Sequence, residues 1–378
     1  MAGIYIHIPF CRQACHYCNF HFSTSLRYKN EFLTALLKEM ELFSVADRST
    51  HAESIGTIYF GGGTPSLLLP DEIQKIIERI NNHFHVETGA EITLEANPDD
   101  ITREKLEGWK QAGVNRLSLG IQSFFEEDLK WMNRAHNANQ AKDNLKLALA
   151  WFPNITIDLI YGTPDLTNEK WKQNVEKVIA MNIPHLSCYA LTVEPKTPLD
   201  KMIRLHQSPG VDLDKQSEQF LLLMEWLENA GYEHYEISNF AKPEHRSRHN
   251  SSYWQGKKYI GFGPSAHSFD GKIRWWNVSN NNLYIQSIHN NILPVEKEVL
   301  TATQQMNEFI MISLRTMEGL DLDRLQAIDP NMEVKNQILK QSRKYQERGL
   351  ADVIGNTIRL TKEGKLMADG IASDLFVD

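Results

Sequence analysis

Three cysteines within eight residues constrain this chain more than any other feature of its sequence. Cys11, Cys15 and Cys18 follow the spacing C-x3-C-x2-C, directly after residues 3–8, an apolar run that predicts a buried strand. Three thiolates can hold three irons of a [4Fe–4S] cluster and leave the fourth iron open to another ligand. A cluster of this kind, at the end of a strand, is therefore the interpretation that we favour.

Two other uses of these cysteines are open. A structural zinc site needs four ligands, and His16 or His21 could supply the fourth, although the spacing is a poor match to zinc fingers. Disulfides are disfavoured because three cysteines are an odd number and the composition is that of a cytoplasmic protein. Cys188, far along the chain in an apolar run, is predicted to be a core residue.

Length and composition limit the number of domains and the class of protein to which the chain can belong. A chain of 378 residues is too long for one compact core, so two or three domains are expected. The net charge of −8 argues against a general nucleic-acid binder. Because we find neither a signal-peptide pattern nor an apolar stretch long enough to span a membrane, we expect a cytoplasmic protein.

Strand and helix patterns alternate as far as residue 191. After the first strand, further strands are expected at 55–60, 91–96, 116–122, 155–161 and 185–191, with helices at 28–46, 70–82, 101–112 and 168–181 between them. Alternation of this kind predicts an α/β fold with a parallel sheet. Functional side chains of such folds gather at the carboxyl ends of the strands.

Glycine and polar residues do follow these strand ends. Gly62, Gly63 and Thr64 come after the second strand, where a backbone without side chains can approach a ligand closely and offer N–H groups to it. A glycine run alone is weak evidence of a site, since most such runs are plain turns. Its place after the second strand of a cluster-bearing fold makes it a candidate ligand-binding loop.

Charged residues also occur where the strands otherwise read as apolar. Glu95 ends the third strand, Gln122 ends the fourth and Asp158 lies in the fifth, with Arg134 between the last two. Buried charges are costly unless they are paired. These residues therefore either form an internal salt-bridge set, with Arg134 paired to Glu95 or Asp158, or they bind a polar ligand.

The cysteine loop resembles that of the radical SAM superfamily, C-x3-C-x-aromatic-C, with Tyr17 as the aromatic residue. The resemblance implies a radical SAM (β/α)6 partial barrel in which the open iron chelates S-adenosylmethionine (SAM). The run Tyr5–Phe10 is similar to the group of oxygen-independent coproporphyrinogen III oxidases and their relatives. In that group the SAM site would consist here of Tyr5, Gly62, Gly63, Thr64, Glu95, Gln122, Arg134 and Asp158.

Beyond residue 191 a polar loop, 242–254, carries a second motif. It closes on His-Asn-x-x-Tyr-Trp, from His249 to Trp254, a pattern that resembles the HemW haem chaperones. The resemblance implies that His249 is an axial ligand of haem, a role that suits a neutral imidazole. Arg246, Arg248 and two nearby lysines could then meet the haem propionates.

We expect three regions in the chain. Residues 1–195 are expected to form the radical SAM partial barrel with the [4Fe–4S] and SAM sites, and 196–299 a barrel-covering extension with the haem-binding loop. Helical patterns followed by a hairpin predict a small C-terminal winged-helix-like α+β domain over 300–378. Its acidic and basic residues nearly balance, so DNA binding is not expected.

The resemblance implies a haem chaperone that binds a [4Fe–4S] cluster, SAM and haem and delivers haem to haem-requiring proteins. Expected partners are haem, haem-accepting proteins such as membrane-associated cytochromes, and a second copy of the chain. The rival is an oxygen-independent coproporphyrinogen III oxidase, against which stand a short N-terminus and Asn19-Phe20, where true oxidases have a further cysteine. A third alternative is a redox-sensing interaction protein that uses the cluster only to control dimerisation.

Overall fold

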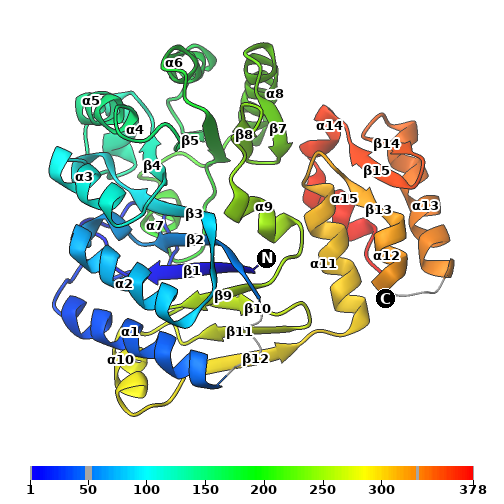
Figure 1. Ribbon diagram of the computed structural model, residues 1–378. Coiled ribbons are helices and arrows are strands. Elements are labelled where there is room, and N and C mark those ends of the chain that lie inside the picture. Colours follow the sequence, from blue (N-terminus) through cyan, green and yellow to red (C-terminus); the bar gives the residue numbers. More distant parts are fainter. Residues whose placement is uncertain (1, 47–52, 329–331, 378) are drawn as a thin grey trace.

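A 12-stranded sheet is the framework of the computed structural model, which describes residues 2–46, 53–328 and 332–377. Six parallel strands in chain order form the middle of the sheet (Figure 1). They are β1 (Ala2–Ile8), β2 (Ile55–Gly62), β3 (Val86–Ala96), β4 (Arg116–Gln122), β5 (Ile155–Tyr161) and β6 (His185–Ala190). This order confirms the predicted partial barrel of parallel strands.

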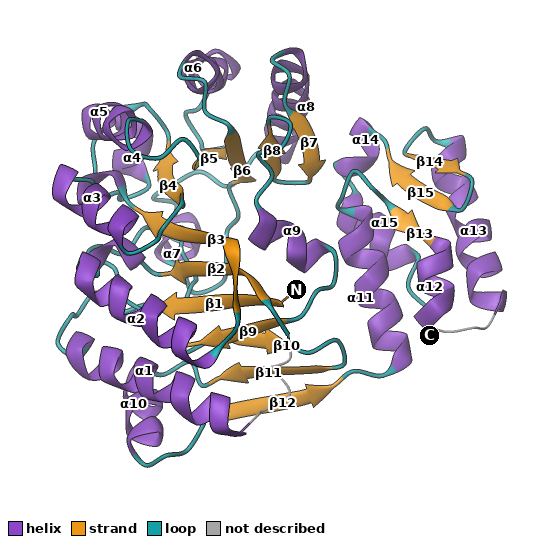
Figure 2. Ribbon diagram, in the orientation of Figure 1, coloured by secondary structure: helices purple, strands orange, loops and turns teal. Residues whose placement is uncertain are grey.

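Helices cover the outer face of the parallel strands (Figure 2). They are α1 (Lys29–Ala46), α2 (Pro70–His83), α3 (Arg103–Gln111), α4 (Glu126–Trp131), α5 (Ala138–Leu149) and α6 (Asn168–Ala180). The connection between β4 and β5 contains two helices, α4 and α5. Among the described residues, we find no helix with the length and apolar character that crossing a membrane would require.

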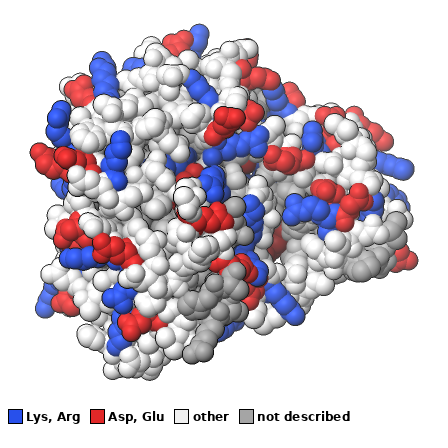
Figure 3. All heavy atoms as spheres, viewed as in Figure 1, with Lys and Arg blue, Asp and Glu red and all other residues white. Residues whose placement is uncertain are grey.

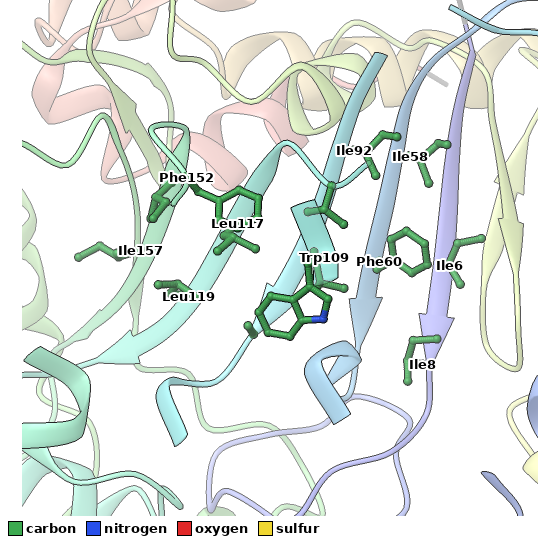
Figure 4. Close-up of a cluster of buried hydrophobic side chains, with 14 of the residues drawn as sticks. Ile6, Ile8, Ile58, Phe60, Ile92, Trp109, Leu117, Leu119, Phe152 and Ile157 are labelled. Carbon is green, nitrogen blue, oxygen red and sulfur yellow. The ribbon is translucent and has the colours of Figure 1, made fainter. Parts of the chain in front are cut away.

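Side chains alternate along the parallel strands between an apolar outer face and a polar inner face. Ile6, Phe60 and Leu117 point outward into the core that the strands share with the helices (Figure 4). Since successive residues of a strand face opposite sides, Tyr59 and Asp158 point inward. The barrel interior is therefore lined with polar groups, which is unusual for a core and marks the place for a ligand.

Shorter strands extend the sheet at both edges. At the β1 edge lie β9 (Tyr259–Phe262), parallel to β1, and then β10 (His267–Phe269), β11 (Ile273–Asn277) and β12 (Val295–Val299), which are antiparallel to their neighbours. At the β6 edge lie β8 (Asn239–Ala241) and β7 (Glu233–Glu236). Helix α7 (Pro198–Arg204) contacts the cysteine loop, because the N–H of Leu199 donates to the carbonyl of His16 at 2.8 Å. Helix α8 (Leu213–Asn229) packs against α6 and β7, and α10 (Asn281–His289) packs against α1.

The expected polar loop 242–254 differs from the structure, because its second half is the helix α9 (Arg248–Trp254). The Ser247 hydroxyl caps this helix by accepting a hydrogen bond from the N–H of Asn250 at 3.2 Å. The carboxylate of Glu91, on β3, accepts the N–H groups of Arg248 and His249 at 3.1 and 3.0 Å. A partner so distant in sequence explains why the local pattern did not reveal the helix.

The C-terminal region has a hydrophobic core of its own. Its elements are α11 (Ala302–Leu314), β13 (Leu320–Asp321), α12 (Leu322–Ile328), α13 (Met332–Glu347), β14 (Ala351–Ile354), β15 (Thr357–Leu360), α14 (Lys362–Lys365) and α15 (Ala368–Asp374). A three-stranded antiparallel sheet beside helices confirms the winged-helix-like α+β fold. This region lies on the side of the barrel where the parallel strands begin (Figure 1). The exact boundaries predicted for the three regions stay predictions.

Candidate functional site

A cavity of about 390 Å³ opens at the carboxyl ends of the parallel strands. Nearly all of the residues predicted for the cluster and for SAM line it. They are Cys11, Cys15, Cys18, Gly62, Gly63, Thr64, Glu95, Gln122, Arg134 and Asp158. Tyr5 lies deeper in the barrel interior, where its hydroxyl is 3.2 Å from Nδ1 of His7.

The cysteine loop leaves β1 and folds back on itself. Its two ends are joined by hydrogen bonds from the N–H of Cys11 to the carbonyl of Ser23, at 3.0 Å, and from the N–H of Ser23 to the carbonyl of Pro9, at 2.9 Å. Burial raises the pKa of Cys11 to about 11, and burial likewise raises the pKa of Cys18. These thiols would give up their protons on binding a metal, because iron and zinc take cysteine as the thiolate.

The three thiols do not converge on one point. Within residues 2–46, 53–328 and 332–377, no group of three or more His, Cys, Asp or Glu side chains has the arrangement that would hold a single metal ion. An iron–sulfur cluster is larger than one ion, and each cysteine binds a different iron. The spacing of Cys11, Cys15 and Cys18 around the cavity therefore suits a cluster better than the zinc alternative.

The glycine loop packs tightly against the cysteine loop. The N–H of Gly63 donates to the carbonyl of Ile8 at 2.8 Å, and the N–H of Thr64 donates to that of Phe10 at 2.7 Å. A Cβ atom on Gly63 would lie 2.5 Å from the Phe10 carbonyl oxygen, too close for any side chain. Glycine is needed here for the loops to pack, and the N–H groups expected to meet a ligand are engaged within the protein.

Two carboxylates, Glu95 and Asp158, line the same cavity, and neither forms an ion pair with another residue of the described part of the chain. Burial raises the pKa of Glu95 to about 8, and the nearby charge of Asp158 adds to the effect. Burial also raises the pKa of Asp158 to about 7. The Tyr59 hydroxyl donates to Glu95 at 2.8 Å. Buried carboxylates of this kind would be stabilised in their charged form by a cationic ligand.

Arg134 pairs with neither carboxylate, so the internal salt-bridge set that the sequence left open is not formed. Its guanidinium donates to the side chain of Asn97 at 2.6 Å and to the carbonyl of Gly120 at 2.9 Å. The same group reaches the Cys15 sulfur at 3.4 Å and the Tyr17 hydroxyl at 3.3 Å. Arg134 thus ties the cysteine loop to the ends of β3 and β4.

Replacing Arg134 with alanine tests this arrangement. Arg134→Ala is expected to weaken SAM binding to the cluster-loaded protein by about 2 kcal/mol, or roughly 30-fold, since a buried charged donor is lost and its partners are left unpaired. Lys130→Ala is the matched control, because Lys130 is mostly exposed and pairs with Glu126 on the same helix. Equal SAM affinity of the two variants, measured by equilibrium binding, would return Arg134 to a purely structural role.

His249 lies at the other end of the barrel, beside the starts of β1 and β2. Its Nδ1 is hydrogen-bonded to the Thr57 hydroxyl at 2.8 Å, and its Nε2 to the Tyr253 hydroxyl at 3.0 Å. The imidazole stacks on the Tyr59 ring, with centroids 4.9 Å apart. Burial lowers the pKa of His249 to about 3, so the ring is neutral at physiological pH. A neutral ring suits a metal ligand, but both nitrogens are already occupied.

The arginines near His249 already have partners within the protein. Arg246 pairs with Glu233 at 3.0 Å and with Glu318 of the C-terminal region at 2.8 Å. Arg248 donates to the carbonyl of Gly89 at 2.9 Å. Both arginines are therefore partly engaged within the protein, and their contacts with haem propionates stay a prediction.

Several residues of these sites were missed by sequence reasoning. Asn97 follows β3 by one residue and lines the cavity, so the strand-end rule that selected Glu95 could have found it. Tyr59 shares the inner face of β2 with Thr57, and its alternation with Phe60 was a usable signal. Glu91 caps α9 from a distance of more than 150 residues, and the sequence holds no signal for that contact.

Comparison with known proteins agrees with the fold. The radical SAM superfamily matches residues 5–178, and the HemN C-terminal domain matches residues 300–367. "Heme chaperone HemW" of Mycobacterium tuberculosis is 34% identical over 379 residues, which cover 99% of this chain and 94% of that protein. The protein of the same name from Bacillus subtilis is 33% identical over 98% of both chains.

A solved structure shows the same fold at lower sequence identity. The coproporphyrinogen III oxidase HemN from Escherichia coli superimposes with a TM-score of 0.86 and 23% identity, over 100% of this chain and 90% of that one. This likeness concerns the fold alone. The relatives of higher identity, which match almost the full length, decide the family: the chain belongs to the HemW family of the radical SAM superfamily.

Proposed function

We propose that this protein is a haem chaperone, which binds a [4Fe–4S] cluster, SAM and haem and delivers haem to haem-requiring proteins. The observation that carries the first part is one cavity lined by three cysteines, a glycine loop and two buried carboxylates. Haem enters the proposal through the relatives, which are named heme chaperone HemW. We place its action in the cytoplasm, where reducing conditions keep thiols such as these free.

The cysteine loop fits an iron–sulfur cluster. Cys11, Cys15 and Cys18 would each hold one iron, and the cluster, when bound, supplies an open iron position to a further ligand. Around it the protein provides hydrogen-bond donors to sulfur: the Thr64 hydroxyl is 3.4 Å from the Cys11 sulfur, and Arg134 is equally close to Cys15. Donors of this kind stabilise thiolates and so favour the ligating form of these cysteines.

The rest of the cavity fits SAM, which carries a positive sulfonium. Glu95 and Asp158 would meet the cation or the ribose hydroxyls, and the ionised carboxylates would no longer be isolated charges. Gln122 and Gly120 lie on the same wall. At about 390 Å³ the cavity is at the lower end of the roughly 300–1,000 Å³ usual for ligand sites, which leaves little space for a tetrapyrrole beside SAM.

The size of the cavity and the residues at its mouth favour the chaperone over the oxidase. Asn19 and Phe20 line the cavity after the third cysteine, and the Phe20 side chain is 66% exposed. The experiment that separates the functions is a haem titration of cluster-loaded protein beside an assay of coproporphyrinogen decarboxylation with SAM and a reductant. We expect about one haem per chain and no decarboxylation. Robust decarboxylation would overturn the proposal.

His249 is the candidate haem ligand, and its burial sets a condition on that role. Nε2 can bind iron only if its hydrogen bond to the Tyr253 hydroxyl is broken, so part of α9 has to move. Helix α9 lies between the barrel and the C-terminal region (Figure 1), where Arg315 stacks on the Trp254 ring at 5.5 Å. Haem binding through His249 would therefore loosen a contact between the two parts.

Removing the imidazole tests this role. His249→Ala is expected to weaken haem binding at least about tenfold and to change the Soret band. Loss of a residue that only hydrogen-bonds a metal ligand lowers metal affinity by about 10- to 100-fold, and loss of the ligand itself should lower it by no less. His245→Ala, an exposed histidine in the same segment, is the matched control. Absorbance titration of both variants is the measurement, and SAM binding should be unchanged. Haem binding that is indifferent to His249 would move the haem site elsewhere.

A further inference from the structure

A second cavity, of about 170 Å³, lies beside α9 on the side of the barrel away from the cysteines. Its wall combines the starts of β1 and β2 with the polar face of α9 and the residues next to it. The polar side chains around it are Thr57 on β2 and, on or next to α9, Arg246, Arg248, Ser251, Ser252, Gln255 and Lys257. Three of them are basic and none of the residues that line this cavity is acidic.

Several of these groups have no partner within the described part of the chain. The ammonium of Lys257, the Ser251 hydroxyl and the Gln255 amide form no hydrogen bond or ion pair with the described residues, whereas Arg246 is held between two glutamates. Arg248 is only 4.0 Å from the Glu87 carboxylate. The uncompensated charge of the cavity is thus close to that of one cation, Lys257.

The cavity is next to the contacts that hold His249. Thr57 lines it, and the Thr57 hydroxyl is hydrogen-bonded to Nδ1 of His249 at 2.8 Å. Ser252 lines it as well, and its hydroxyl donates to the His249 carbonyl at 2.7 Å. A ligand in this cavity would sit one side chain away from the imidazole.

Size and charge together indicate the kind of ligand. A volume of about 170 Å³ is below the roughly 300 Å³ at which sites for whole organic ligands begin, so only a small group could enter. The Ser251 hydroxyl, the Gln255 amide and the Lys257 ammonium are donors for an anion, and a single uncompensated cation matches a single negative charge. A carboxylate fits this description better than a doubly charged phosphate.

We propose that this cavity binds one propionate carboxylate of haem, with the macrocycle outside it against α9. The proposal rests on the haem function proposed above and adds to it a docking point that holds haem next to His249 before α9 opens. On the face shown in Figure 3, Lys and Arg alternate with Asp and Glu over both parts of the molecule. A local site with free donors is therefore needed to hold the porphyrin at one place.

The test compares two neighbouring lysines in the full-length, cluster-loaded protein. Lys257→Ala is expected to weaken haem binding about three- to fivefold, the upper range for an exposed ion pair. Lys258→Ala removes the same charge, but Lys258 pairs with Glu53 and lies outside the cavity, so haem affinity should be unchanged. Adding Gln255→Ala to Lys257→Ala should increase the loss to about tenfold, because a second donor is lost.

The ligand is varied in parallel, using haem, iron-free protoporphyrin IX and the dimethyl ester of haem. The Lys257→Ala loss should appear with haem and with protoporphyrin IX, which both carry propionates, and should vanish with the ester. If haem binds but Lys257→Ala and Lys258→Ala behave alike, the docking site is overturned and the haem function stands. If the wild-type protein binds none of the three porphyrins, both proposals fall. A Lys257→Ala effect that persists with the ester would exclude a propionate as the ligand.

Discussion

Cys11→Ala, Cys15→Ala and Cys18→Ala are each expected to abolish the iron–sulfur cluster. The cavity offers three thiols for three irons, so that loss of one leaves two irons without a protein ligand. After anaerobic reconstitution, the wild-type chain should hold about four irons and absorb visible light, and each variant should do neither. Iron analysis and visible absorption are the measurements.

Cys188→Ala is the matched control for these variants. Cys188 lies on β6 with 1% of its surface exposed and packs within the main hydrophobic core. Its loss removes a small buried side chain that is not among those lining the cavity, so the cluster content should match that of the wild type. Loss of the cluster in this variant would show that Cys188 is a ligand and that the assignment of three cysteines is wrong.

Glu91→Ala is expected to cause the largest loss of stability, about 3–5 kcal/mol in the free energy of unfolding. The Glu91 side chain is 5% exposed, and its carboxylate caps the first turn of α9. Arg116 lies beside it, with Nε 4.0 Å from the carboxylate, and is buried too. Removing Glu91 leaves a buried guanidinium without a counter-charge and two N–H groups without an acceptor.

Glu87→Ala on the same strand is the control. Glu87 is partly exposed, lies 4.0 Å from Arg248 and accepts a hydrogen bond from Ser54. Its loss should cost no more than about 1 kcal/mol, as for other surface pairs. Urea unfolding of both variants, followed by circular dichroism, gives the comparison. Similar unfolding midpoints would show that α9 does not depend on its cap from β3.

The framework of the fold could be predicted because its signals are local. Ile4, Ile6 and Ile8 alternate with polar residues on β1, and the same period of two recurs on the other parallel strands. Glu95 at the end of β3 and Asp158 within β5 line one cavity, because the ends of parallel strands meet at one edge of a sheet; their role in binding SAM stays a prediction. Helix α9 was missed although Ser247 is a local capping signal, and its first two N–H groups are accepted by Glu91 on a strand remote in sequence.

Contacts between distant segments account for the other differences. One of the two alternatives for Arg134 paired it with Glu95 or Asp158, yet its partners include Asn97 and the carbonyl of Gly120, which only the folded chain brings within reach. The sequence predicted only a polar loop around His249 and gave no sign that the imidazole is buried. Its burial depends on Thr57 and Tyr59, which come from β2. Periodicity shows the face on which a residue lies, but not the element that covers it.

The inward-facing carboxylates affect the folding stability of the protein, and so its lifetime, when no ligand is bound. The pKa of Glu95 is raised to about 8 from its ordinary 4.5, so the folded state keeps a proton that the unfolded chain releases. Stability is therefore lost as the pH rises from about 4.5 through 8. A bound cation would offset this loss, and any ligand that binds only the folded state adds to stability by mass action. Molecules without their ligand would open more often and be degraded sooner, which would tie the abundance of the protein to the supply of its cofactor.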